Sequence, residues 1–186
     1  DWLILLTASF TNSFFAAILG IVLFLYLLEL GLSKKQALFI SLLGLFTTNL
    51  LVYAKHSFPH MMFVSFLFLS FFLVKKHFQT KRNKFLIFAG LSFGVVSITY
   101  NQTFLLAVLP LGLYFLLLSK FKFSLSAFKS LVLRLLIFFE GFLPMLIVYL
   151  WFENLRSGSV QNLANPLNVV TRGVAPFLDI PKPVFF

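Results

Sequence analysis

The chain is built from long apolar runs that short polar segments separate. A helix of 17 residues is about 25 Å long, which is just enough to cross the hydrocarbon of a bilayer. The apolar residues cover nearly the whole circumference of each expected helix, as they do in lipid-embedded helices. The pattern therefore predicts an all-α, polytopic transmembrane helix bundle of about six spans. The runs occupy residues 2–28, 37–53, 61–74, 85–100, 104–118 and 131–151.

Local breaks in the pattern predict details of these helices. Thr11-Asn12-Ser13 interrupts the first run and indicates a bent or interfacial segment. The third run is short, and Pro59 is favoured in a first helical turn, so that helix is expected to begin near Pro59. Asn101-Gln102-Thr103 predicts a tight hairpin between the fourth and fifth spans, and Gly141 and Pro144 predict a kink in the sixth.

The chain is expected to divide into two parts. Residues 1–152 would form the helical bundle, within which the small residues Ala89, Gly90, Gly94 and Ser97 have a spacing that suits close helix contacts in lipid. Ser, Gly, Asn and Pro become frequent from Glu153, so residues 153–186 are interpreted as an extracytoplasmic loop or interfacial segment.

Composition supports a membrane protein. The 186 residues are 60% hydrophobic and 11% charged, with a mean hydropathy of +1.00. The net charge of +10 could suggest nucleic acid, but the charges cluster at the ends of apolar runs, which fits membrane topology and no nucleic-acid partner. The missing initiator Met and the apolar end at Phe186 favour an excerpt of a longer chain. The absence of Cys excludes disulfides and thiolate metal ligands.

The Lys and Arg residues predict an orientation. The segments 30–36, 75–84 and 119–134 together hold 11 of them, whereas the segments on the other side hold four. The positive-inside rule then places the segment around Lys55, the 101–103 turn and the C-terminal tail outside the cytoplasm. The expected location is therefore a cell membrane, crossed several times, with the active face extracytoplasmic.

The polar elbow between the second and third runs is the main candidate site. It contains Tyr53, Lys55, His56 and His60. Lys and His side chains can hold the phosphate of an anionic head group, so this elbow is a candidate substrate-binding rim. Its alternative role is interfacial anchoring by Tyr and Lys. A metal pair of His56 and His60 is disfavoured, because Pro59 disturbs the helical spacing and no third ligand is evident.

Further polar residues have open roles. Asn101 and Gln102 are expected at the same outer face, where they would bind a sugar or phosphate or simply form a turn. Glu140 lies in the middle of the sixth run and is interpreted as a structural polar contact, with a functional role as the alternative. Glu29 is expected to be solvated. The sequence contains no phosphate-binding loop, no GxSxG and no zinc-ligand spacing, so no complete catalytic constellation is present and the catalytic residues stay unknown.

Four segments in order resemble a known family. They read YAKHSFPHMM, AGLSFGVVSITYNQTFLLAVLPLGLYFLL, EGFLPMLIVYLWFENLRSGSV and RGVAPFLDIPKPVFF. Their order and spacing resemble the GT-C superfamily of polytopic glycosyltransferases, in particular the dolichyl-phosphate-mannose protein mannosyltransferase-like branch (glycosyltransferase family 39-like). Departures include Glu153 where the family has Asn, Ser157 where it has Phe, Pro183 where Gly is usual, and His60 where many members carry an acidic residue.

The resemblance implies a GT-C-like fold and a function. Such an enzyme transfers a sugar, mannose or another hexose, from a polyprenyl-phosphate donor to an acceptor glycan, lipid or protein on the extracytoplasmic face. In the family the catalytic acid lies in a first outer loop that this chain does not contain. No cofactor is evident, although a divalent metal stays open for the full-length enzyme. The alternatives are a transporter or flippase of a lipid-linked substrate, which needs inverted repeats, and a structural membrane subunit.

Overall fold

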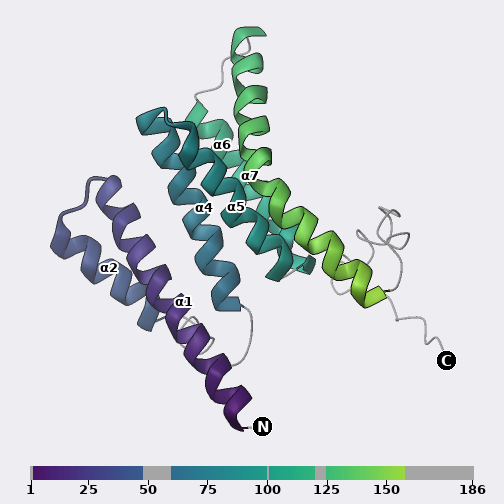
Figure 1. Cartoon of the computed structure of the whole chain (residues 1–186). Coiled ribbons are helices and arrows are strands. Elements are labelled where there is room, and N and C mark those ends of the chain that lie inside the picture. The colour runs from purple at the N-terminus through teal and green to yellow at the C-terminus, as the bar shows by residue number, and fades with distance from the viewer. Residues whose placement is uncertain (1, 48–59, 100, 120–124, 158–186) are drawn as a thin grey trace, which may run out of the picture.

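The structure, a computed structural model, describes residues 2–47, 60–99, 101–119 and 125–157 (Figure 1). These residues form helices joined by short connections, and within the described ranges there is no β-strand. The all-α class expected from the apolar runs is therefore confirmed. The helices are α1 (Trp2–Glu29), α2 (Lys34–Phe46), α4 (His60–Thr80), α5 (Asn83–Thr99), α6 (Asn101–Ser119) and α7 (Leu125–Ser157).

The helices run alternately up and down, so the bundle has two distinct ends (Figure 1). The His60 end holds the start of α4, the end of α5 and the start of α6. The Lys81 end holds the α4–α5 turn, the α1–α2 connection and the start of α7. Gly31, with φ of +90°, ends α1 in the left-handed conformation, and Ser33 then caps α2 together with Gln36.

Helix α5 is the centre of the bundle and lies between α4 and α7 (Figure 1). A β-carbon at Gly90 would collide with the carbonyl oxygen of Phe138 on α7, and one at Gly94 would meet the side chain of Met145. On another side of α5, the Ser70 hydroxyl of α4 donates to the carbonyl oxygen of Ala89 at 3.0 Å. The predicted close-packing role is confirmed for these three α5 residues, whereas Ser97 donates within its own helix to Gly94.

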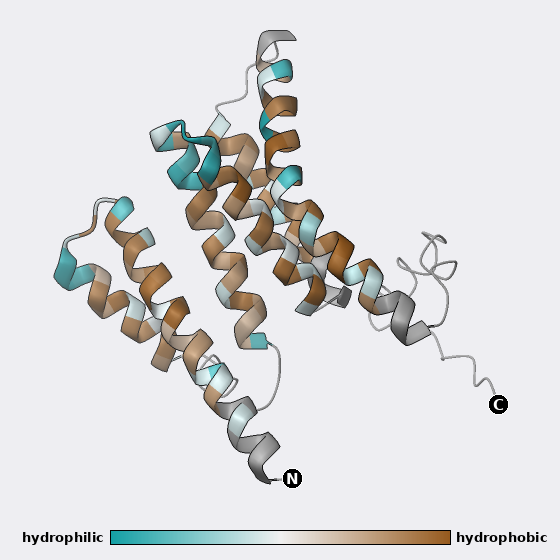
Figure 2. Cartoon of the chain, in the orientation of Figure 1, coloured by the Kyte–Doolittle hydropathy of each residue, from teal (hydrophilic) through white to brown (hydrophobic). Residues whose placement is uncertain are grey.

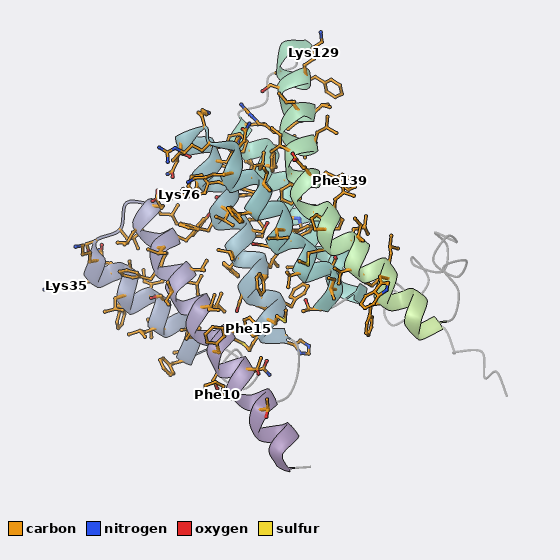
Figure 3. The ribbon with its side chains drawn as sticks, in the orientation of Figure 1. Phe10, Phe15, Lys35, Lys76, Lys129 and Phe139 are labelled. Carbon is orange, nitrogen blue, oxygen red and sulfur yellow. The ribbon has the colours of Figure 1, made fainter. Side chains whose placement is uncertain are left out.

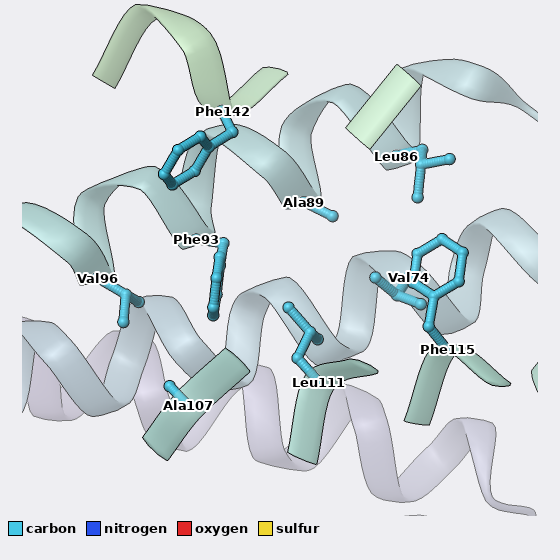
Figure 4. Close-up of a cluster of buried hydrophobic side chains, with 9 residues drawn as sticks. All are labelled: Val74, Leu86, Ala89, Phe93, Val96, Ala107, Leu111, Phe115 and Phe142. Carbon is cyan, nitrogen blue, oxygen red and sulfur yellow. The ribbon is translucent and has the colours of Figure 1, made fainter. Parts of the chain in front are cut away.

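A hydrophobic core joins α4, α5, α6 and α7 (Figure 4). Phe93 of α5 lies between Phe138 and Phe142 of α7, with ring centroids 5.9 and 6.4 Å away. A second, smaller cluster joins α1 to α4 through the fully buried Leu19 and Met61. The buried residues of the first core, the one that joins α4 to α7, are Val74, Leu86, Ala89, Phe93, Val96, Ala107, Leu111, Phe115 and Phe142.

The outer surface of the bundle is apolar along most of its length (Figure 2). Leu117 is 75% exposed, Leu109 66% and Trp151 63%, and similar residues surround them. Water would not favour such a surface, whereas lipid does. Three helices are long and apolar enough to cross a membrane, over Phe10–Glu29, His60–Thr80 and Ala127–Phe152. Two shorter apolar helices, Asn83–Thr99 and Leu106–Ser119, accompany them.

Several expected boundaries were wrong. The bounds of α1 agree with the expected run 2–28, and the helix continues through Thr11, whose hydroxyl donates to the carbonyl oxygen of Thr7 at 2.8 Å. α4 begins at His60, beside the predicted start, but runs to Thr80 rather than residue 74. Asn101-Gln102-Thr103 is the first turn of α6 and not a hairpin loop. Unpaired amides of a first turn favour polar side chains, which also makes such residues look like a loop in sequence.

α7 contains the expected break. It extends from Leu125 to Ser157 with Pro144 inside it, and Figure 1 shows its direction changing midway, near the Phe139 labelled in Figure 3. Proline has no N–H to donate to the carbonyl four residues earlier, which here belongs to Glu140. The lost hydrogen bond accounts for a kink one turn before Pro144. The second expected span, 37–53, is described only to residue 47, where α2 has already ended at Phe46.

Candidate functional site

The start of α4 is fixed firmly against α1. His60 is the first residue of α4 and is half-buried, and Met61 beside it is fully buried. The Ser65 hydroxyl lies 2.7 Å from the carbonyl oxygen of Phe15 on α1 and 2.6 Å from that of Met61. Its one proton is shared between these two oxygens, so a polar contact joins α1 to the first turns of α4. His60 therefore sits on a rigid helix end.

Asn12 brings a buried polar side chain to the same level of the bundle. α1 and α4 run in parallel, and Phe15 lies beside Ser65. Asn12 is about one turn before Phe15, just as Met61 is one turn before Ser65, so Asn12 lies level with the start of α4. Its residue is only 6% exposed. Sequence reasoning treated Asn12 as part of a bend and missed this site; a lone amide inside an apolar run was the available signal.

The start of α6 lies at the same end of the bundle as His60. α6 runs parallel to α4, with the ring centroids of Phe71 and Tyr114 5.2 Å apart. Asn101 and Gln102 form its first turn. Helix N-termini carry unpaired N–H groups and about half a positive charge each, so they favour anions. The His60 end thus combines the N-termini of α4 and α6 and the C-terminus of α5 with a half-buried imidazole.

The remaining expected site residues are outside the described part of the chain. Tyr53, Lys55 and His56 fall in the 48–59 segment, and the side chains of Asn101 and Gln102 are not described either. The structure therefore brings together the backbone positions of His60, Asn101 and Gln102 at one end of the bundle. Among the described residues, no three His, Asp or Glu side chains are grouped as a metal site requires.

The Lys81 end carries a polar network between α1, α4 and α6. Glu29, expected to be solvated, instead forms a half-buried ion pair with Lys76. The Lys75 ammonium donates to the Glu29 carbonyl oxygen at 3.0 Å and lies 5.0 Å from the centroid of the Tyr26 ring. The Tyr26 and Tyr114 hydroxyl oxygens are 2.9 Å apart. These contacts fix the C-terminus of α1, where a cation is also favoured by the helix dipole.

Glu140 has no such partner in the described part of the chain. It lies on an exposed side of α7, next to Phe139, which is 47% exposed. Exposed Leu136 and Leu143 flank it one turn away on either side. The structural polar contact expected for Glu140 is therefore not found among the described residues.

Comparisons of the chain with protein-family models, with curated proteins and with solved structures found no match.

Proposed function

We propose that the chain is part of a multi-pass membrane protein that binds a polyprenyl-phosphate-linked sugar at the His60 end and serves transfer of the sugar to an acceptor on the extracytoplasmic face. In this proposal about six segments cross the membrane, and the Lys81 end faces the cytoplasm because it carries most of the Lys and Arg residues. The fold is a GT-C-like bundle, and the catalytic acid lies outside residues 1–186.

The observation that carries the proposal is the shared end of α4 and α6. Both helices begin at the end of the bundle that holds the half-buried His60, and α5 ends there, so two positive helix-dipole ends and one negative end lie at this level. The phosphate of a lipid-linked sugar carries negative charge at the membrane surface, and it gains more as the glycosidic bond breaks. Helix N-termini and cations that are fixed beforehand stabilise such developing charge. Lys55 and His56, next along the chain to this end, supply the cations in the proposal.

The buried amide of Asn12 supports a polar site at this level. An apolar bundle gains no packing advantage from an amide that is almost fully buried, and polar residues at membrane depth commonly line substrate or ion paths. Asn12 and His60 come from two helices that pack together at this level, and α6 begins at the same end of the bundle.

Donor binding is the test that suits this chain, because it does not need the catalytic acid. The full chain is reconstituted in phosphatidylcholine vesicles, and retention of a radiolabelled polyprenyl-phosphate sugar is measured for wild type and for Lys55→Ala. The matched control is Lys129→Ala, which removes an exposed cation at the opposite end (Figure 3). We expect tight retention by wild type and the control, and loss with Lys55→Ala.

Two results would oppose the proposal. Equal retention by Lys55→Ala and Lys129→Ala would assign the elbow to membrane anchoring. Movement of the intact donor across the vesicle membrane, with no sugar released to any acceptor, would assign the site to a flippase instead.

A further inference from the structure

We propose that the α4–α5 turn and the start of α7 form a binding site for the phosphate head group of an anionic phospholipid, made by Lys81, Arg82 and Arg134. This site lies at the Lys81 end, opposite the end assigned to the sugar donor. It involves none of the donor-binding residues and holds whether or not the chain serves sugar transfer.

The backbone of the turn is fixed without help from its basic side chains. The Lys81 N–H donates to the carbonyl oxygen of His77 at 2.7 Å, and Lys81 has a φ of 57°, in the left-handed region. The Arg82 carbonyl oxygen accepts from the Phe85 N–H at 3.2 Å and from His77 Nδ1 at 3.2 Å. A carbonyl can only accept, so Nδ1 of the buried His77 carries the proton. The exposed Lys81 and Arg82 side chains are thereby presented by a rigid turn.

One aromatic ring gathers cations from two separate parts of the chain. The Arg134 guanidinium of α7 lies 4.9 Å from the centroid of the Phe78 ring, and the Lys81 ammonium lies 5.8 Å from the same centroid. The Phe115 ring packs edge-on against Phe78 at 5.4 Å and holds it in place. The ring thus brings the two cations to the same part of the surface, where a bound anion can interact with both. The guanidinium fork of Arg also matches the geometry of a phosphate.

No carboxylate of the described residues neutralises this group. Glu29 pairs with Lys76 on the α1 side of the bundle. Glu140 lies six residues after Arg134 on α7, which places it on a different side of that helix. The exposed Lys84, at the start of α5, adds further positive charge beside the turn. A negative ligand from outside the chain is therefore the partner that the charge distribution favours.

The position of the turn along the helices selects a lipid as the source of the anion. The candidate membrane span of α4 is His60–Thr80; its apolar run ends at Val74, and Lys81 follows its last residue. On α7, the apolar residues Leu133 and Leu135 are 60% and 45% exposed and flank Arg134 along the helix. Cations at the level where an apolar helix surface ends meet the head groups of a bilayer, and basic groups between transmembrane helices there bind anionic lipids. A soluble anion would leave the neighbouring apolar surface uncovered.

Native mass spectrometry of the full chain tests the site. The protein is transferred from neutral detergent in the presence of phosphatidylglycerol or phosphatidylcholine with the same acyl chains. The test variant is Arg82→Gln/Arg134→Gln. The control is Lys34→Gln/Lys35→Gln, which removes the same charge from two exposed residues at the start of α2. We expect wild type and the control to retain phosphatidylglycerol about tenfold more tightly than phosphatidylcholine, and the test variant to lose this preference.

Each other outcome bears on the proposal. Equal retention of both lipids by wild type would overturn it. An equal loss of the phosphatidylglycerol preference in the two double variants would also overturn it, because diffuse surface charge would then explain binding. Displacement of phosphatidylglycerol by millimolar inorganic phosphate would replace the lipid site by a simple anion site. If Arg82→Gln/Arg134→Gln does not fold, Lys81→Asn/Arg82→Gln gives the same test with exposed residues only, since Asn tolerates the left-handed conformation of residue 81.

Discussion

A β-carbon on Gly141 would collide with the carbonyl oxygen of Ile87, so α7 and α5 touch backbone to backbone where they cross. Gly90 makes the reciprocal contact, with its α-carbon facing the carbonyl oxygen of Phe138. Such contacts need glycine on both helices, because backbone atoms cannot move aside as a flexible side chain can. In lipid, close backbone approach of this kind is a main source of helix association.

The crossing gives the first prediction. Gly141→Val should lower the free energy of unfolding by about 2 kcal/mol or more, because overpacking a tight contact forces the helices apart. The matched control is Gly112→Ala in α6, where an added β-carbon would meet nothing within 4 Å. It should leave stability unchanged or raise it by up to about 1 kcal/mol, the difference in helix propensity. Thermal unfolding in detergent, followed by circular dichroism, measures both; equal unfolding temperatures would contradict the packing argument.

The ion pair between Glu29 and Lys76 gives the second prediction. Both side chains are about one quarter exposed, 25% and 29% respectively, so water screens their attraction in part. We expect a coupling free energy of about 1 kcal/mol between Glu29→Gln and Lys76→Met in a double-mutant cycle. The exposed Lys35→Met is the control and should show no coupling to Glu29→Gln. A coupling free energy of zero would mean that the ion pair contributes nothing to the α1–α4 contact.

Orientation is the third prediction. Single cysteines at Gln79 and Ser57 report the two ends directly, since the chain has no native Cys. An impermeant thiol reagent should label residue 57 and spare residue 79 in intact cells, because 11 of the 15 Lys and Arg residues lie in the segments expected inside. Labelling of residue 79 alone would invert the orientation and move the proposed donor site to the cytoplasmic face.

The fourth prediction concerns Glu140. Because this carboxylate is exposed among apolar residues of α7, Glu140→Leu should not lower the stability of residues 1–186 and should raise it if lipid covers this side. Glu140→Gln is the isosteric comparison and should behave nearly as wild type. Unfolding in nanodiscs measures both variants. A clear loss of stability with Leu and not with Gln would reveal a hydrogen-bonding partner outside the described residues.

The fifth prediction follows from the proposed sugar transfer and applies to a preparation of the protein that carries out that transfer. Lys55→Ala should lower kcat/KM for sugar transfer about 10²-fold, or on the order of 3 kcal/mol, because a cation beside the leaving phosphate is worth more in a partly dry site. Lys55→Arg keeps the charge and should have a smaller effect. Transfer from a radiolabelled lipid donor in proteoliposomes measures both, with protein abundance as the control. Near-normal transfer by Lys55→Ala would remove the elbow from the reaction.

The presence of each described helix could be predicted from the sequence, but the residues at which the helices begin and end could not. The apolar runs located every described helix, and the small residues of α5 identified its contact surface. The pattern failed where polar residues are used inside helices. Lys75 and Lys76 lie beyond the expected apolar run 61–74, yet in α4 they bind the carbonyl and carboxylate of Glu29, a partner 46 or 47 residues away. A hydropathy pattern describes neighbouring residues only, so it cannot predict an ion-pair partner that is so distant in sequence.

For the candidate site too, part of the arrangement could be predicted from the sequence and part could not. That His60 and Asn101 share an end of the bundle follows from counting spans, and the structure agrees. The burial of Asn12 could not be read in advance, because it depends on how α1 docks on α4 through Phe15 and Ser65. A polar residue in an apolar run has the same appearance in sequence whether it bends its helix, faces lipid or contacts a neighbouring helix.

The turn between α4 and α5 also constrains how the protein is made. Only Lys81 and Arg82 separate the two helices, and these residues are already bound into the helix ends by backbone hydrogen bonds. A connection this short keeps the end of α4 and the start of α5 side by side. Under the proposed topology the two helices would therefore insert into a bilayer as one hairpin, with the positive charges of the turn on the side where synthesis takes place.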